Sequence, residues 1–424
     1  MPLLDRAFYL LDSPHSPQDF TLILHLNGAP DVDRFYAGAK SAMNRFPVSA
    51  CCVDGPAWVW RENKYFKLER VTAGSEIERF IDEPFDLRRQ PPVKQMLILD
   101  GGTRLATRFH HSAADGLSAA LWLGHQLNVA YGLEAAQSER GEFNGLALRR
   151  SAMSVRRSQF AFDGASDRLW TASPRRSGVR RWLTIGFPAM ELQKICRRAG
   201  GFTYNDLLAT CTLEVLSRWN STLGRPRSAA PTNGSGEIEI HGGDCRGGTP
   251  WPPQVGLWMP MNIRRNSGAG FGNGTSRIRI YARYDPDAKL IDKCREVRRQ
   301  VSWTTEHGEW VVPEIPWFTR MPRPIIGPLL RGYLNRPAVD MATGVFSHAG
   351  SGMANACDAF RHVERIECVG LLHPRQSLAV NGATHHGHTW LTLTYDPALL
   401  SIDDINELSS LYKEQIALAR QELS

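Results

Sequence analysis

Short apolar runs alternate with longer stretches of helical periodicity along most of the chain. Residues 19–27 form an apolar run typical of a β-strand. Asp31 or Asp33 then precedes apolar residues at helical spacing, so we expect a capped helix that ends near Pro47. A second short helix is expected over 75–81. The pattern predicts an α/β protein.

The clearest pattern runs from residue 93 to residue 129. Residues 93–99 and 104–109 are largely apolar and are separated by the turn sequence Asp-Gly-Gly, which predicts a β-hairpin. Apolar residues recur at helical spacing from Leu117 to Val129, and Asp115 stands at the expected N-cap. Residues 110–116, which read HHSAADG, are therefore expected to follow a strand and to turn sharply into a helix.

Two histidines at a strand end suit proton transfer. Neutral imidazole accepts a proton near pH 7, and a strand held in a sheet is a rigid support for it. Asp115 could fix the turn through an ion pair, and Gly116 leaves room for a substrate. A purely structural interpretation is also open: one packed histidine, one solvated histidine and an ordinary Asp N-cap.

The alternation restarts after residue 180. A Thr203-x-x-Asp206 capping box opens one of the helices. Strands are expected at 182–187, 255–265, 278–281, 343–350, 363–371, 377–384 and 389–395. Helices are expected at 188–198, with Pro188 in the first position, and at 203–219, 287–306, 325–334 and 401–423.

Composition divides the chain into parts. Residues 134–180 are rich in Ser, Arg, Gly and Ala with weak periodicity, which is typical of a crossover linker. We therefore predict an N-terminal subdomain over 1–133 and a C-terminal one over 181–424, with a Gly/Pro-rich insertion at about 224–253. The basic cluster at 175–181 could face a phosphate, or it is a solvated part of the linker.

Bulk composition is that of an ordinary soluble protein, with 42% hydrophobic and 22% charged residues. The formal net charge of +7 fits nucleic acid, an anionic cofactor, an acidic carrier protein or simply a basic surface. The 8 cysteines show no C-x-x-C spacing, and neither a signal peptide nor a membrane-spanning run is evident. We predict a cytoplasmic protein with no integral membrane segment and no nucleic-acid partner.

Two further groups of side chains could bind a metal. One is the histidine turn at residues 385–388, and the other is the set His241, Asp244 and Cys245 in the Gly-rich insertion. Neither has the spacing of a recognised metal site, so we predict no metal centre.

Residues 110–116 resemble the HHxxxDG signature of a large acyltransferase superfamily. Its members include chloramphenicol acetyltransferase, condensation domains of peptide synthetases, wax ester synthase/diacylglycerol acyltransferases and polyketide-associated acyltransferases. All four fixed positions match. Residues 83–87 (EPFDL) resemble a segment of condensation domains, and residues 202–210 resemble a helix start of the wax ester synthases. The D-F-G-W-G motif of plant-type members is missing.

The resemblance implies two chloramphenicol acetyltransferase-like subdomains, each an α+β sandwich, that form a V with a tunnel at their interface. It implies acyl transfer from a thioester to a hydroxyl or amine, on a small-molecule or lipid acceptor. The donor would be acyl-CoA or a phosphopantetheinyl carrier, which can be a separate acyl carrier protein, and no cofactor would be bound permanently. The length of the chain favours a monomer.

The resemblance also implies roles for single residues. His111 would be the general base, His110 would support the fold, and Asp115 would pair with Arg264, with Arg265 as the fallback. Backbone N–H groups near Gly116, or Ser347 and Asn273, would line the tunnel and stabilise an oxyanion. A non-catalytic condensation-like domain that binds a carrier protein or another partner is the alternative, and a hydrolase is a third. The sequence leaves the donor, the acceptor and the pathway open.

Overall fold

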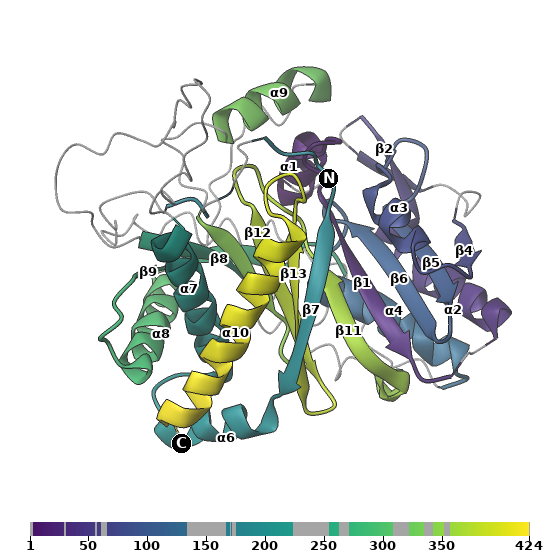
Figure 1. Ribbon diagram of the computed structural model, residues 1–424. Helices are drawn as coiled ribbons and strands as arrows, with labels where there is room; N and C mark the ends of the chain where they lie inside the picture. Colours follow the sequence, from purple (N-terminus) through teal and green to yellow (C-terminus); the bar gives the residue numbers. More distant parts are fainter. Residues whose placement is uncertain are drawn as a thin grey trace, which may run out of the picture.

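The computed structural model describes most of the chain. The described residues are 3–28, 31–55, 57–60, 66–133, 167–169, 171, 175–223, 254–262, 271–307, 322–334, 342–351 and 357–423. They form two lobes side by side, each built on its own sheet (Figure 1).

The first lobe is built on a five-stranded sheet with the order β11-β1-β6-β5-β4. Its neighbouring strands are antiparallel except β4 and β5, which run parallel. The strand bounds are β1 Asp19–Leu26, β4 Leu68–Val71, β5 Val93–Leu99, β6 Thr103–His110 and β11 Val363–Val369. A small separate hairpin joins β2 Cys51–Asp54 to β3 Ala57–Trp60.

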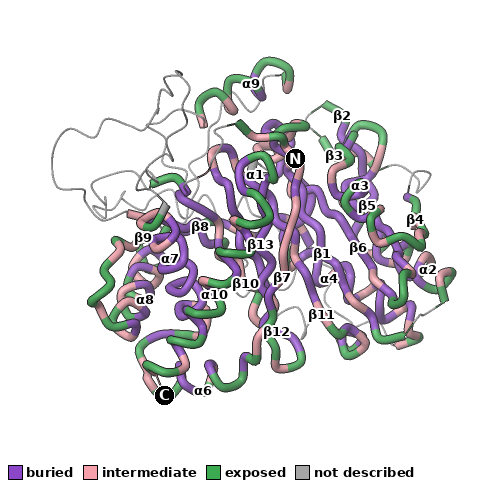
Figure 2. The backbone as a smooth tube through the Cα atoms, viewed as in Figure 1, coloured by how far each residue is buried: buried purple, intermediate pink, exposed green. Residues whose placement is uncertain are grey.

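Helices cover both faces of this sheet. The helices α2 (Val32–Arg45) and α4 (Gly116–Ala130) lie against one face and share its core, in which Trp122 is fully buried. The short helix α3 (Glu76–Asp82) packs Ile77, Phe80 and Ile81 on the other face. The central strands β1 and β6 are buried along almost their whole length (Figure 2).

The second lobe is built on a six-stranded sheet with the order β7-β13-β12-β10-β8-β9. The strand bounds are β7 Arg181–Pro188, β8 Gln254–Asn262, β9 Thr275–Arg283, β10 Gly344–His348, β12 Leu378–His385 and β13 His388–Tyr395. Four helices share the core on one of its faces: α6 Met190–Ala199, α7 Tyr204–Leu223, α8 Leu290–Glu306 and α10 Ile402–Leu423.

The opposite face of the second sheet turns to the first lobe. The Thr394 hydroxyl oxygen there accepts a hydrogen bond from the backbone N–H of Gly370, at 3.0 Å. Strand β11 comes late in the chain and yet pairs with β1 of the first sheet, so the two lobes share one crossing segment. The subdomain boundaries at 133 and 181 stay a prediction.

Most predicted elements are confirmed. The hairpin 93–109 and the helix capped by Asp115 are present, and Asp31 caps α2 through the backbone N–H of Asp33 at 2.8 Å. In the capping box Asp206 Oδ2 accepts from the backbone N–H of Thr203 at 2.7 Å, and the Thr203 hydroxyl accepts from that of Asp206 at 3.2 Å.

Two predictions are wrong. Pro188 does not begin a helix: it is the last residue of β7, paired with His388, and α6 starts at Met190. The solvated-linker interpretation of 175–181 is wrong for Arg180, which is 1% exposed and whose guanidinium bonds Asp19 at 2.7 Å, whereas Arg175 and Ser177 are exposed. Arg180 points inward because its charge is balanced by the buried carboxylate of Asp19, which lies 161 positions away in sequence.

Two further helices lie together at one end of the molecule, α1 (Leu3–Leu11) and α9 (Arg323–Leu334) (Figure 1). The sequence pattern did not predict α1. No helix in the described part of the chain combines the length and the hydrophobicity that crossing a membrane requires.

Candidate active site

The histidine pair is fixed to the end of β6 by its backbone. The N–H of His110 donates to the carbonyl of Pro92, and the N–H of His111 donates to the carbonyl of Gln18, each at 2.8 Å. The chain then turns through residues 112–114 into α4. Both imidazoles are therefore held where the sheet ends, as the sequence predicts.

His110 is completely buried, and its ring stabilises the turn that follows β6. Its Nδ1 accepts from the backbone N–H and the hydroxyl of Ser112, at 3.1 and 2.7 Å. Its Nε2 therefore carries the proton and faces Asp12 Oδ1 at 3.7 Å. Burial acts to raise the pKa of Asp12, but the His110 ring and the backbone N–H of Gln18 together outweigh it, and the pKa falls below the ordinary 3.8. These contacts agree with a structural role for His110.

His111 is only partly buried and lies between aromatic rings. Phe8 of α1 stacks on it at 4.3 Å between centroids and 17° between planes. Phe20 of β1 lies on it at 5.1 Å with a tilt of 57°. The ring is therefore fixed by packing, which favours a defined direction for its two nitrogens.

Asn273 decides which nitrogen of His111 carries the proton. Its Oδ1 lies 3.3 Å from His111 Nδ1. Its Nδ2 donates to Asp5 Oδ1 at 2.8 Å and to the backbone carbonyl of His111. Because both amide hydrogens face oxygen acceptors, Oδ1 must be the atom that faces the ring. Nδ1 of His111 then donates, and Nε2 keeps a lone pair that can accept a proton.

The electrostatic surroundings also favour neutral His111. Burial lowers its pKa below 6.5, while the Asp115 carboxylate and the Asn273 contact oppose that shift. The net direction is downward, so the ring is an unprotonated base at pH 7.

Asp115 joins the motif to the second lobe. Its Oδ1 accepts from the backbone N–H of Ser118 at 2.9 Å, which caps α4. Its Oδ2 accepts from the backbone N–H of Gly274 at 2.9 Å and from the hydroxyl of Thr275 at 2.6 Å. The predicted partners Arg264 and Arg265 lie outside the described residues, so that ion pair stays a prediction.

Gly116 and Ser347 lie on the kinds of element that the sequence predicts, the start of a helix and a strand. Gly116 is the exposed first residue of α4, and a Cβ at this position would point into open space. Ser347 is half-buried on β10 and pairs with Asn381 of β12. The role of Asn273 as an oxyanion donor is not favoured, because both of its amide hydrogens are already donated.

The sequence reasoning missed the contribution of α1 and the loop after it. Asp5, Phe8 and Asp12 all contact the motif or its amide partner. The signal was a short amphipathic stretch at the start of the chain, in which Leu4, Phe8 and Leu11 recur at helical spacing.

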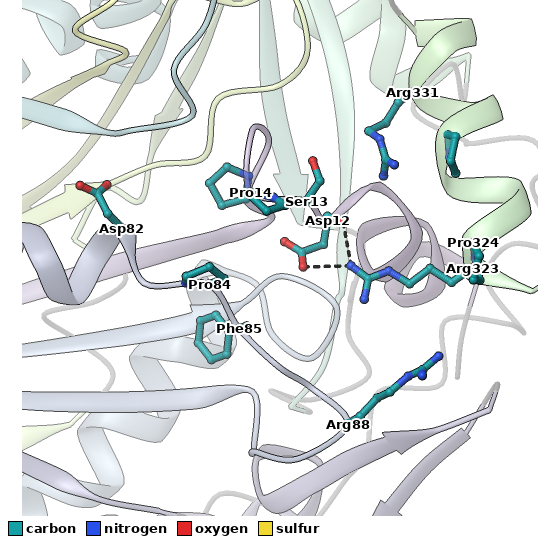
Figure 3. Close-up of a pocket in the computed structure, with 12 residues that line it drawn as sticks. Asp12, Ser13, Pro14, Asp82, Pro84, Phe85, Arg88, Arg323, Pro324 and Arg331 are labelled. Carbon is teal, nitrogen blue, oxygen red and sulfur yellow. Dashed lines mark hydrogen bonds and ion pairs between the residues drawn. The ribbon is translucent and has the colours of Figure 1, made fainter.

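A cavity of about 460 Å³ opens beside Asp12 (Figure 3). Phe85, Arg88 and Arg331 line it, and Arg323 reaches Asp12 Oδ2 at 3.2 Å. Phe85 also contacts the edge of His110, so this cavity lies behind the histidine pair. Within the described ranges, no three His, Cys, Asp or Glu side chains gather as metal ligands would.

Comparisons with known proteins find similar proteins by structure but not by sequence. No protein-family model matches the chain, and no curated protein matches it by sequence. The first condensation domain of the calcium-dependent antibiotic synthetase, solved with a substrate analogue, matches with a TM-score of 0.69 at 13% identity. That match covers 99% of this chain and 96% of that one.

Two further structures agree with it. A mutant of the starter condensation domain of rhizomide synthetase, in complex with C8-CoA, has a TM-score of 0.65 at 12% identity, over 99% of this chain and 93% of that one. Polyketide synthase associated protein 5 from Mycobacterium tuberculosis has a TM-score of 0.62 at 12% identity, over 96% and 95%. The chain has the condensation-domain fold.

This fold is the one that the HHxxxDG resemblance implies, and its two-lobed architecture is confirmed. In the condensation-domain fold of this chain, the predicted histidine pair lies where the first lobe meets the second. There Asn273 of the second lobe contacts His111, and Gly274 and Thr275 bond the Asp115 carboxylate of the same motif.

Proposed function

We propose that the chain is an acyltransferase that moves an acyl group from a thioester to a hydroxyl or amine acceptor, with His111 as general base. The contact between His111 Nδ1 and Asn273 Oδ1 carries the proposal. It leaves Nε2 as the proton acceptor on a ring that is neutral at pH 7.

The reaction needs two proton transfers through that one nitrogen. Nε2 takes the proton of the acceptor O–H or N–H as the acceptor attacks the thioester carbonyl. The tetrahedral intermediate then collapses, the carbon–sulfur bond breaks, and the departing thiolate takes the proton back from His111. A positioned base of this kind contributes roughly 10²–10⁴-fold in rate.

The oxyanion of that intermediate needs donors. Backbone N–H groups at the start of α4, next to Gly116, and the hydroxyl of Ser347 are the proposed ones. A helix N-terminus favours negative charge, which supports the first choice. His110 and Asp115 would act by holding the turn, since His110 Nδ1 and both Asp115 carboxylate oxygens accept hydrogen bonds within the protein.

The donor is proposed to be acyl-CoA or an acyl group on a phosphopantetheinyl carrier. One structural neighbour was solved in complex with C8-CoA, which supports this class of donor. The net charge of +7 is compatible with either anionic donor.

The test is thiol release from a panel of acyl-CoA donors, with and without alcohol and amine acceptors. His111→Ala should lose roughly 10²–10⁴-fold in kcat while the unfolding midpoint stays near that of the wild type. His388→Ala is the matched control, because that histidine is exposed on the β12–β13 turn.

Three results would contradict the proposal in different ways. Full activity of the His111 variant removes the mechanism. Equal thiol release without any acceptor indicates a hydrolase. No release from any donor, together with binding of a carrier protein, indicates a non-catalytic domain.

A further inference from the structure

The cavity beside Asp12 has walls that are already rigid. It opens between the loop after α1, the segment after α3 and the helix α9 (Figure 3). The prolines that line it are Pro14, Pro17, Pro84, Pro324 and Pro328. Because a proline ring fixes the φ angle, these walls have little conformational freedom to lose when a ligand binds. The cavity is therefore suited to hold a ligand without rearrangement.

Close packing of α9 on α1 fixes the two arginines of α9. A Cβ at Gly327 would lie 2.8 Å from the carbonyl oxygen of Leu10, so the two helices are in contact there. Arg323 donates to the Asp12 carboxylate at 3.2 Å, and Arg331 donates to the Leu10 carbonyl at a long 3.4 Å. Arg331 forms no ion pair with any described residue. Both guanidinium groups are thus held at the cavity wall, and the charge of Arg331 is not balanced there.

Arg88 reaches the same cavity from the first lobe. It lies in the segment between α3 and β5, beside the Tyr9 side chain of α1. Its backbone N–H donates to Asp86 Oδ1 at 3.2 Å, which fixes the turn that carries it. In the view of Figure 3 the Arg323 side chain lies between Arg331 and Arg88. Three guanidinium groups from two distant parts of the sequence therefore line one cavity.

The acidic side chains of the cavity are already balanced by cations. Asp12 pairs with Arg323, and Asp82 pairs with Arg181 at 2.7 Å. The other two arginines of the cavity form no ion pair with a described residue. Their two positive charges are therefore in excess, which favours an anionic ligand.

A phosphate dianion fits this arrangement better than a carboxylate does. The two oxygens of a carboxylate fill the fork of a single guanidinium group. A phosphate has further oxygens, which can accept from a second guanidinium group that approaches from another direction. Its charge of about −1.5 to −2 at pH 7 also matches the excess charge of the cavity. Arg88 is exposed, so the site is open to a ligand from solution.

We propose that Arg88 and Arg331 bind the phosphate group of a small-molecule ligand in this cavity, with Arg323 as a third cation beside them. The inference goes beyond the proposed function, because phosphate binding here requires neither His111 nor an acyl group. Two sources carry this chemistry: coenzyme A, and a separate phosphorylated molecule or free phosphate. The test distinguishes them.

The test measures the binding of inorganic phosphate by calorimetry at low ionic strength, where screening is weak. The wild type should bind phosphate, and Arg88→Gln and Arg331→Gln should each raise the dissociation constant by about 10–100-fold, since charged hydrogen bonds are lost. Arg89→Gln is the matched control, because the Arg89 side chain is 88% exposed and lines a different surface pocket. It should stay within about twofold of the wild type. Melting temperatures near that of the wild type show that the variants are folded.

Coenzyme A and pantetheine, which lacks every phosphate, distinguish the two sources. If coenzyme A is the ligand, it should displace inorganic phosphate and bind about tenfold more tightly than pantetheine, and Arg331→Gln should abolish that difference. If the ligand is a separate phosphorylated molecule, inorganic phosphate should bind and coenzyme A should not displace it. Either result assigns a phosphate site to the cavity.

The assignment is overturned if the wild type binds neither inorganic phosphate nor coenzyme A, or if Arg88→Gln and Arg331→Gln bind them as the wild type does. Failure of the proposed function gives a different result. Thiol release is then absent from the wild type, while phosphate binding still depends on Arg88 and Arg331. Conversely, thiol release together with phosphate binding that neither variant weakens refutes the phosphate site alone.

Discussion

The buried carboxylate of Asp19 allows the sharpest test of how the strand that carries the histidine pair is held. Asp19 begins β1, and its two oxygens meet Arg180 at 2.7 Å and Arg108 at 3.0 Å. All three residues are at most 1% exposed. Arg108 is on β6, two residues before His110, and Arg180 precedes β7 of the second lobe. The triad therefore connects the histidine strand to both lobes.

The magnitude follows from the pKa of Asp19. Burial acts to raise it, but the charges and hydrogen bonds of Arg108 and Arg180 outweigh burial and lower it to about 2 from 3.8. At 1.36 kcal/mol per pKa unit the ionised form stabilises the fold by about 2.5 kcal/mol. Because the folded pKa is the lower one, this stability is present above pH 3.8 and is lost as the pH falls through about 2.

Asp19→Asn should cost more than that. The amide keeps the shape but leaves two guanidinium groups buried without a counter-charge, and breaking a buried pair in this way costs about 3–5 kcal/mol. Urea denaturation followed by circular dichroism measures the loss at pH 7. The matched control is Glu69→Gln, because Glu69 and its partner Arg79 are exposed and such pairs are worth about 0–1 kcal/mol.

The result that would refute this reasoning is a loss below 1 kcal/mol in Asp19→Asn, or one equal to that of Glu69→Gln. The triad would then contribute little, and the strand end would be held by its backbone hydrogen bonds alone. A change in the denaturant slope would instead indicate that the variant unfolds in more than one step.

Three further predictions concern the motif itself. Asp115→Ala should lower the free energy of unfolding by about 2–4 kcal/mol, because the cap of α4 and two hydrogen bonds between the lobes are lost. An unchanged melting temperature would contradict this. The acidic limb of the kcat/KM profile should have its midpoint below 6.5, because burial lowers the pKa of His111; a midpoint above 6.5 is the contrary result. Asn273→Ala should move that midpoint lower still, because the amide contact raises the pKa of His111. It should also reduce kcat by roughly 10²-fold, because the His111 ring is no longer held with its proton on Nδ1. An unaltered kcat would mean that Asn273 does not orient the ring.

The sequence predicts the local parts of the site well. The apolar runs around Asp100-Gly101-Gly102 and the Asp115 cap are short-range signals, and the structure has the same hairpin and helix. The capping box at Thr203 is of the same kind. Such features depend on residues a few positions apart, so periodicity and cap chemistry are sufficient to find them.

The parts that join the lobes could not be predicted in this way. Asn273 lies 162 positions from His111 and 268 from Asp5, and nothing in the local pattern pairs them. Arg180 belongs to a basic run whose composition is that of a solvated linker, and only the fold supplies Asp19 as its partner. Propensity cannot report a contact that depends on the packing of distant elements.

The candidate base is a property of the interface between the lobes and not of the motif alone. The first lobe supplies the His111 ring and its aromatic neighbours, but the acceptor for Nδ1–H comes from Asn273, just before β9 of the second lobe. Gly274 and Thr275 then bond Asp115 on the other side of the turn. Each bond alone contributes about 1 kcal/mol, yet together three consecutive residues fix both the tautomer and the turn. An HHxxxDG turn whose lobes were apart would keep its imidazole but lose the contact that directs Nε2 toward an acceptor.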